Sequence, residues 1–219
     1  MRQFNSNTFV CFIDISGFKN ELQKDINSAG KMLDVFYSAG YNTLKKHKSL
    51  NGIFVSDCGI IYSDKGKNSS KLNDILSAIK EINQKMLSEN YLTTASIAYG
   101  YLEYKKKFVF DRIKKNAIVG SGYLNAFLDN EYVIPKLRPG EVRITKNLNG
   151  ILNSNDIFEN LDYTNKNLNF LTNTNTHLYF NWLCEDKTNL QNVDFIYSQY
   201  DIDLTNEKYE NLKKRLKEL

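Results

Sequence analysis

The amino-acid sequence predicts an α+β fold, a sandwich in which helices pack on one mixed or antiparallel sheet. Apolar runs typical of strands alternate along the chain with stretches of helical periodicity. A β-hairpin is expected to interrupt this alternation within residues 51–63. The resulting order of elements has a ferredoxin-like character and predicts that the helices lie on one side of the sheet.

The first half of the chain contains the clearest elements. Residues 8–15 form an apolar run with β-branched and aromatic residues, which predicts a buried strand that ends near a carboxylate. Residues 19–47 have apolar side chains at helical spacing in two pieces. Residues 51–63 hold two short β-rich runs around a central Ser-Asp-Cys, which predict a tight hairpin. Residues 71–89 are typical of an amphipathic helix.

The second half contains shorter elements. Residues 92–104 alternate like a strand, and residues 120–130 suggest a helix that is opened by glycines. Residues 140–152 predict a strand followed by a short helix, and residues 176–183 predict a last strand or helix. Residues 205–219 predict a charged C-terminal helix.

The composition favours one globular domain. Of 219 residues 42% are hydrophobic, which is enough for one well-buried core. The net charge is +4 with lysines spread along the chain, a pattern that does not indicate nucleic-acid binding. Three Cys and two His residues predict neither a disulfide framework nor a zinc cluster. We find no signal peptide and no apolar run of roughly 18–20 residues, so we expect a cytoplasmic protein without a membrane segment.

Two carboxylates stand out by their positions. Asp14 ends the first predicted strand, and Asp57 lies in the predicted hairpin. If that strand lies beside the hairpin, the two carboxylates share one spot, where they repel unless a cation neutralises them. Hard divalent ions take oxygen ligands and bridge carboxylates to substrate phosphates, and a pair of ions can activate one oxygen and stabilise another. The pair therefore predicts a divalent-metal site.

The segment after Asp14 adds a candidate phosphate site. Ser16, Gly17 and Phe18 are expected to present backbone N–H groups at a helix N-terminus, which suits a triphosphate. Taken alone, Asp-Ser-Gly is also typical of a plain helix N-cap, and Ser-Asp suits an ordinary hairpin turn. The order of elements between the two carboxylates favours the functional interpretation of both.

These motifs, in this order, resemble class III nucleotidyl cyclases. FIDISGF (12–18) is similar to the family signature F-x-D-[IVL]-x-G-F, and FVSDCGII (54–61) is similar to the hairpin motif. The similarity covers roughly residues 8–152. Its later members are ASIAYGYL (95–102), AIVGSGYLNAFLDNE (117–131) and GEVRITKNLNGIL (140–152). Together with a late LYFNWL segment, the set is more similar to the pyrimidine cyclases of bacterial anti-phage Pycsar systems than to adenylate cyclases.

The resemblance implies a catalytic domain over residues 1–152, with a C-terminal extension over residues 153–219 packed on the same domain. Asp14 and Asp57 would bind two Mg²⁺ or Mn²⁺ ions with the help of the Ile15 carbonyl, and the loop 15–18 would hold the triphosphate. The ribose 3′-hydroxyl would attack the α-phosphorus of UTP, or of CTP, and expel pyrophosphate. The resemblance further implies a homodimer with composite active sites. Its 3′,5′-cyclic product would act on a separate cyclic-nucleotide-sensing effector.

The sequence departs from adenylate cyclases where the base is read. Those enzymes commonly carry a Lys a few residues before the hairpin Asp, where this chain has Ile53 and Phe54. The change favours a smaller pyrimidine pocket, in which Phe54 is a candidate for packing on the base.

The family's Asn-x-x-x-Arg helix pattern is also altered. Its positions fall on Leu124 and Leu128 or on Asn125 and Asp129, according to the register. A cation for the transition state must then come from elsewhere. The candidates are Arg112, Lys114, Lys115 and Lys105, each of which also fits a solvated surface charge.

The leading functional hypothesis is therefore a pyrimidine nucleotide cyclase, a phosphorus–oxygen lyase that makes a second messenger in anti-phage defence. One alternative is a non-catalytic, nucleotide-binding dimeric regulatory module on the same fold, and the altered helix pattern is its main support. A purine cyclase with unusual base contacts is a further alternative.

Overall fold

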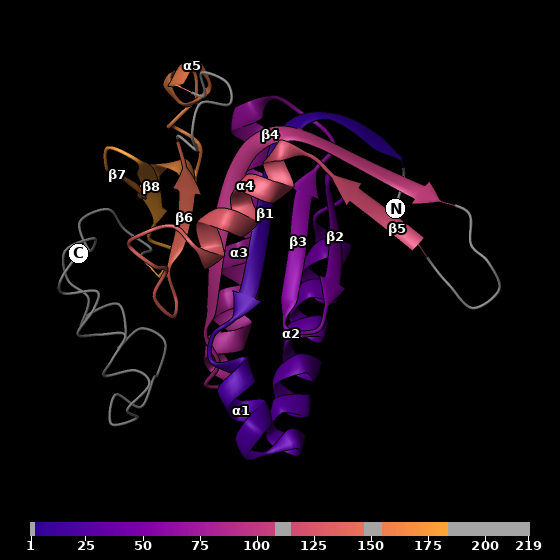
Figure 1. Ribbon diagram of the computed structural model, residues 1–219. Coiled ribbons are helices and arrows are strands. Elements are labelled where there is room, and N and C mark those ends of the chain that lie inside the picture. Colours follow the sequence, from indigo (N-terminus) through magenta and orange to yellow (C-terminus); the bar gives the residue numbers. More distant parts are fainter. Residues whose placement is uncertain (1–2, 108–114, 147–154, 184–219) are drawn as a thin grey trace.

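A computed structural model describes residues 3–107, 115–146 and 155–183 of the chain (Figure 1). Most predicted elements of the described part are present close to their expected places. In chain order the elements are β1 (Phe4–Ile15), α1 (Phe18–Lys24), α2 (Ile26–Lys46), β2 (Leu50–Val55), β3 (Cys58–Ser63), α3 (Asn68–Ser88), β4 (Thr93–Lys107), β5 (Lys115–Val119), α4 (Ser121–Glu131), β6 (Val142–Thr145), α5 (Asn155–Glu159), a 3₁₀ turn (Leu168–Phe170), β7 (Leu171–Asn173) and β8 (His177–Phe180).

One mixed sheet organises the molecule. Its strands lie in the order β2-β3-β1-β4-β6-β8-β7, and β5 pairs with the outer part of β4. Every described pair is antiparallel except β4 with β6, which run parallel. The longest ladder joins β1 to β4, from Phe4 opposite Tyr104 to Ile15 opposite Thr93. Figure 1 shows β4 and β5 extending together beyond the other strands.

The larger part of the core lies between the sheet and helices α2 and α3, and we call this side of the sheet the α2/α3 face. Alternate side chains of β1, at Phe9, Cys11, Ile13 and Ile15, are buried there. The apolar stripe of α3 packs against them, as its helical spacing predicts. Its buried apolar members are Leu72, Ile75, Leu76, Ala78, Ile79, Ile82, Met86 and Leu87.

The opposite side of the sheet is covered by α4, and we call it the α4 face. The intervening side chains of β1, at Val10 and Phe12, point to this side. Phe12 packs on Ala126 and Phe127 of α4, and the Phe12 and Phe127 ring centroids are 5.3 Å apart. The expectation that all helices lie on one side of the sheet is therefore wrong. In Figure 1, α4 crosses in front of β1 and β4, while α2 and α3 lie behind the sheet.

Glycines allow α4 to approach the sheet closely. A Cβ atom on Gly100 of β4 would lie 2.6 Å from the backbone nitrogen of Gly122 in α4. Gly120, just before the helix, has φ 146° and a Cβ there would lie 2.1 Å from the Tyr101 carbonyl oxygen. Neither position can take a larger residue without moving backbone. The glycines that open the predicted helix thus seat α4 on β4.

The described part of residues 153–219 extends the same sheet. β8 pairs antiparallel with β6, and Arg143 lies opposite Tyr179. Trp182 is buried, and its indole N–H donates to the Gly140 carbonyl oxygen at 2.7 Å. The predicted domain boundary at residue 152 stays a prediction, and the predicted helix over residues 205–219 lies outside the described residues. Within the described part of the chain, no helix combines the length and the apolar character needed to cross a membrane.

Candidate active site

Asp14 and Asp57 come together at one end of the β1–β3 ladder. Asp14 lies directly opposite Cys58 in the antiparallel register, and Asp57 is the residue before Cys58 in the β2–β3 turn. The next backbone contact ties the two segments further, because the Ile15 N–H donates to the Asp57 carbonyl oxygen at 2.9 Å. The structure thus brings the two predicted carboxylates to neighbouring positions.

The environment of Asp14 disfavours its negative charge. Burial, followed by the charges of Asp57 and Glu131, raises the pKa of the Asp14 carboxyl to about 7. Burial and the same carboxylates also raise the pKa of the Cys58 thiol, so this cysteine stays protonated. Glu131 is the last residue of α4 and was not predicted from the sequence. Three acidic groups therefore act on one another at this end of the sheet.

The loop after Asp14 is only partly open to a ligand. The Ser16 N–H, expected to face a phosphate, instead donates to the Leu92 carbonyl oxygen at 2.9 Å. The Ser16 Oγ atom is buried and has no partner in the described part of the chain. Gly17 has φ 79°, and the buried Phe18 begins α1, where backbone N–H groups lack a partner inside the helix. The available donors are thus the Ser16 hydroxyl and the backbone N–H groups of Gly17 and Phe18.

The carboxylate pair fits a divalent cation that shares its ligands with a substrate. A positive charge between Asp14 and Asp57 would relieve the repulsion that raises the pKa of Asp14. Within residues 3–107, 115–146 and 155–183, no group of three or more His, Cys, Asp or Glu side chains is placed to hold a metal. Phosphate, water or backbone carbonyl oxygens, of which Ile15 offers one, would have to complete the coordination.

The structure corrects the expectation that Phe54 shares a pocket with the carboxylates. Phe54 pairs with Gly59, which pairs with Ile13, so Phe54 points to the α2/α3 face. Asp14 alternates with Ile13 and therefore lies on the α4 face. On β2 the side chains that share the α4 face are those of Asn51, Ile53 and Val55, and Val55 pairs with Cys58, the partner of Asp14. The sequence alone could not give the face on which Phe54 lies, because a shift of one residue in the strand register moves every side chain to the opposite face of the sheet.

The predicted transition-state cations do not lie beside Asp14 in the same chain, as far as they are described. Lys105 is exposed and pairs with Glu103. It lies 11 positions beyond Thr94, the partner of Asp14 on β4, or roughly 35 Å at the usual strand rise. Lys115 begins β5 opposite Lys107, while Arg112 and Lys114 lie outside the described residues.

A buried charge network, which the sequence did not predict, holds the end of α4. Asp129 and Arg143 are both fully buried, and the Arg143 Nε donates to Asp129 Oδ2 at 2.8 Å. His177 Nε2 lies 2.8 Å from Asp129 Oδ1, and the Ser96 hydroxyl also donates to Asp129. Burial alone would raise the Asp129 pKa, but hydrogen bonds from His177, Arg143 and Ser96 hold it below its usual range.

This network also decides what α4 can offer to a ligand. Asp129 is one of the candidate positions for the family's helix pattern. Its carboxylate contacts Arg143 and His177 inside the protein and is therefore not available to a ligand. Leu124 is about half exposed, at 49%, and Leu128 is partly buried. No local signal in the sequence indicated the Asp129–Arg143 pair, because the two residues lie 14 positions apart in different elements. The one hint was His177 at the start of a short apolar strand.

Comparison with solved structures identifies the fold. The chain resembles the guanylyl cyclase Cya2, with a TM-score of 0.58, 10% identity, and coverage of 82% of this chain and 93% of that chain. It resembles the adenylyl cyclase CyaB from P. aeruginosa, with a TM-score of 0.56, 13% identity, and coverage of 82% and 95%. It also resembles the guanylate cyclase domain of RhGC from Catenaria anguillulae in complex with GTP, with a TM-score of 0.59, 9% identity, and coverage of 82% and 97%.

No protein-family model matches the sequence, and no curated protein matches it. The solved structures nevertheless have the mixed sheet and packed helices seen here. The chain therefore has the fold of class III adenylyl and guanylyl cyclase domains. The fold class predicted from the sequence is confirmed.

Proposed function

We propose that the chain is a nucleotidyl cyclase that converts UTP, or CTP, into the 3′,5′-cyclic monophosphate and pyrophosphate. The observation that carries this proposal is the meeting of Asp14 and Asp57 at adjacent backbone positions on a cyclase fold. A partly buried carboxylate with a raised pKa beside a second carboxylate is expected where a cation binds.

The residues of the site have distinct roles in this proposal. Asp14 and Asp57 hold the divalent ions, Mg²⁺ or Mn²⁺, which when bound neutralise the triphosphate and favour ionisation of the ribose 3′-hydroxyl. The N–H groups of Gly17 and Phe18 bind phosphate oxygens at the start of α1. The Ser16 hydroxyl gains the partner that it lacks within the described protein. Glu131 adds negative charge that attracts cations to this end of the sheet.

We infer that the enzyme acts as a homodimer with composite sites. The cationic end of the β4–β5 hairpin lies far along the sheet from the carboxylates of its own chain. A second copy can bring Lys105, or one of Arg112, Lys114 and Lys115, to the triphosphate that the first copy holds. In this arrangement each copy supplies the cation that stabilises the transition-state charge in the site of the other copy.

A pyrimidine substrate is supported by the apolar residue on β2 where adenylate cyclases commonly carry a base-reading Lys. Ile53 lies on the α4 face and packs in an apolar cluster with Ile60 and Tyr123. An apolar residue at this position gives no hydrogen bond to the polar edge of a purine. The pyrimidine preference, the second-messenger role in anti-phage defence and the separate effector follow from the sequence resemblance.

The test is a panel of the four ribonucleoside triphosphates with Mn²⁺, in which products are identified by mass spectrometry. We expect a cyclic uridine or cytidine monophosphate together with one pyrophosphate for each turnover. A cyclic purine product would overturn the pyrimidine assignment and keep the cyclase. Absence of every cyclic product would overturn the enzymatic proposal.

A non-catalytic nucleotide-binding module is the second candidate. The family's Asn and Arg positions fall on Leu124 and Leu128 or on Asn125 and Asp129, and Asp129 is committed to a buried network. Such a module should gain thermal stability when UTP and Mn²⁺ are added, without turnover. The same protein sample can be used for both measurements, so the two candidates separate cleanly.

A further inference from the structure

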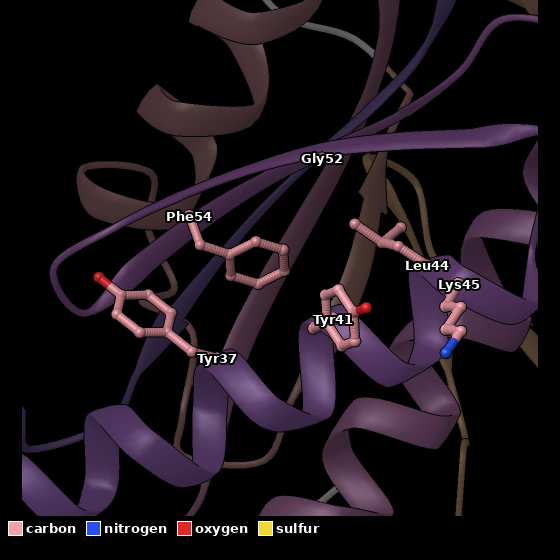
Figure 2. Close-up of a pocket in the computed structure, with 6 residues that line it drawn as sticks. All are labelled: Tyr37, Tyr41, Leu44, Lys45, Gly52 and Phe54. Carbon is pink, nitrogen blue, oxygen red and sulfur yellow. The ribbon is translucent and has the colours of Figure 1, made fainter. Parts of the chain in front are cut away.

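A pocket lies between α2 and β2, on the side of the sheet that faces away from the carboxylates. It has a volume of about 660 Å³ and is lined by Tyr37, Tyr41, Leu44, Lys45, Gly52 and Phe54. Figure 2 shows Tyr37, Tyr41 and Leu44 of α2 pointing toward β2, the Phe54 ring extending from β2 toward them, and the Lys45 side chain pointing away from the strand. Pockets of roughly 300–1,000 Å³ are typical of small-ligand sites.

The shape of the pocket depends on two glycines. A Cβ atom on Gly40 of α2 would lie 2.4 Å from Phe54 Cζ, so only glycine lets the Phe54 ring rest on the helix. A Cβ atom on Gly52 of β2 would lie 2.5 Å from Leu44 Cδ1, so the Leu44 side chain packs directly against the backbone of β2. The hollow is therefore part of the packing between helix and strand.

Three aromatic rings surround this hollow. The Tyr37 and Phe54 rings meet edge to face, with centroids 6.4 Å apart and an interplanar angle of 86°. Tyr41 is 65% exposed, far more than core packing requires. Exposed and roughly orthogonal rings offer faces and edges on which a planar ligand ring can stack. The rings therefore select a flat, aromatic ligand.

The charge at the pocket is positive. Lys45 Nζ lies 5.9 Å from the centroid of the Tyr41 ring, and no ion pair of Lys45 is found in the part of the chain that the structure describes. The neighbouring Lys46 and His47 are already occupied by Glu81, at 3.0 and 2.9 Å. Lys45 thus remains available for an anionic group on a ligand.

Backbone groups add hydrogen-bonding capacity. β2 is the outermost strand of the described sheet, so one of its edges has no strand paired to it there. The outward N–H and C=O groups of an edge strand can bond to polar groups of a ligand. The pocket thus combines aromatic faces and one cation beside an open strand edge.

We propose that this pocket binds a planar aromatic ring that carries an anionic group, at the size of a mononucleotide. The ring stacks among Tyr37, Tyr41 and Phe54, and the anion lies at Lys45. The site is separate from the carboxylate pair, because Phe54 and Asp14 lie on opposite faces of the sheet. Binding here needs no divalent ion, and it does not depend on the proposed cyclase activity.

The test compares three probes by saturation-transfer and chemical-shift NMR, in the presence of EDTA. UMP has both ring and charge, uridine lacks the charge, and ribose 5-phosphate lacks the ring. We expect UMP to bind most tightly. Lys45→Ala should weaken UMP binding about fivefold and leave uridine unchanged, the size expected for an exposed ionic contact. Tyr41→Ala should weaken UMP and uridine alike, by about tenfold, the size expected for loss of one stacking partner.

Two control variants locate the binding. Lys46→Ala removes a neighbouring charge that is paired with Glu81 and should leave UMP binding unchanged. Asp57→Asn alters the carboxylate pair and should also leave it unchanged. Melting temperatures show that each variant is folded. The proposal is overturned if UMP does not bind, or if Lys45→Ala and Tyr41→Ala bind it as well as the natural sequence. Loss of binding in Asp57→Asn alone would place the nucleotide at the carboxylates instead.

Discussion

The carboxyl group of Asp14 has a strongly raised pKa at the candidate site. Its pKa is raised to about 7 by burial and by the charges of Asp57 and Glu131, whereas an unfolded Asp titrates near pH 4. Between these two values the folded chain keeps a proton that the unfolded chain loses. Stability attributable to this residue is therefore complete below about pH 4 and is lost as the pH rises through about 7.

The substitution Asp14→Asn should remove this loss. In EDTA at pH 8 we expect the free energy of unfolding to rise by roughly 1–2 kcal/mol, less than the full pKa shift implies because Asp14 is partly solvated. The advantage should shrink toward zero near pH 4. Urea unfolding at several pH values measures it, and a constant difference across that range would contradict the assigned cause.

Residue-level prediction from the sequence succeeded where a side chain follows from its strand position. Asp14 and Asp57 were placed correctly next to each other because a strand end and a hairpin turn are local features. The face on which Phe54 lies was not predictable, since it depends on the register between β2 and β3. Glu131 was missed because its approach to Asp14 depends on how α4 crosses the sheet.

At the scale of elements, α4 is the part whose position matters most to the site. Its first turn rests on glycines of β4 and of the preceding loop, and its last turn is tied to β4, β6 and β8 through Asp129. The helix itself was predicted, as a segment opened by glycines. The Asp129–Arg143–His177 network was not, because it joins residues from three segments that only the folded topology brings together.

Arg143→Ala should destabilise the protein strongly. It leaves the Asp129 carboxylate buried with only part of its compensating network, and such losses cost about 3–5 kcal/mol. Lys85→Ala is a matched control, because the exposed Lys85–Glu89 pair should contribute no more than about 0.5 kcal/mol. Denaturant unfolding of both variants checks the difference. Equal, small effects would show that the buried network is not needed for stability.

Gly100→Ala tests the close seating of α4. The added methyl group would meet the Gly122 backbone nitrogen at 2.6 Å, so we expect a loss of about 1–3 kcal/mol in the free energy of unfolding. Gly30→Ala in α2 meets nothing within 4 Å and should instead stabilise the protein by about 0.5–1 kcal/mol. Thermal melts of the two variants should therefore shift in opposite directions.

At the scale of the whole molecule, the two candidate sites lie on opposite faces of the sheet. The α4 face carries the carboxylate pair, and the α2/α3 face carries the core and the aromatic pocket. The fold class was predictable because its elements have strong periodicity. The helix on the second face was not predicted to lie there, because both faces of β1 are apolar and periodicity cannot say which helix covers which.

The proposed composite site predicts how activity depends on protein concentration. If each site needs residues from two copies, specific activity should rise with protein concentration and reach a plateau as the dimer forms. Enzyme assays over a dilution series, with sedimentation velocity at the same concentrations, measure both quantities. A specific activity that stays constant through dissociation into monomers would contradict the composite site.

We propose that Asp14 and Asp57 together support cyclisation of a nucleoside triphosphate. The most direct measurement is the Mn²⁺-dependent rate at which cyclic nucleotide forms in the natural sequence, in Asp14→Asn and in Asp57→Asn, with the exposed Asp34→Asn as control. We predict that each carboxylate variant stays folded but loses at least about a hundredfold in rate, whereas Asp34→Asn keeps it. A folded Asp14→Asn or Asp57→Asn variant that makes cyclic product at the natural rate would contradict this role of the carboxylate pair.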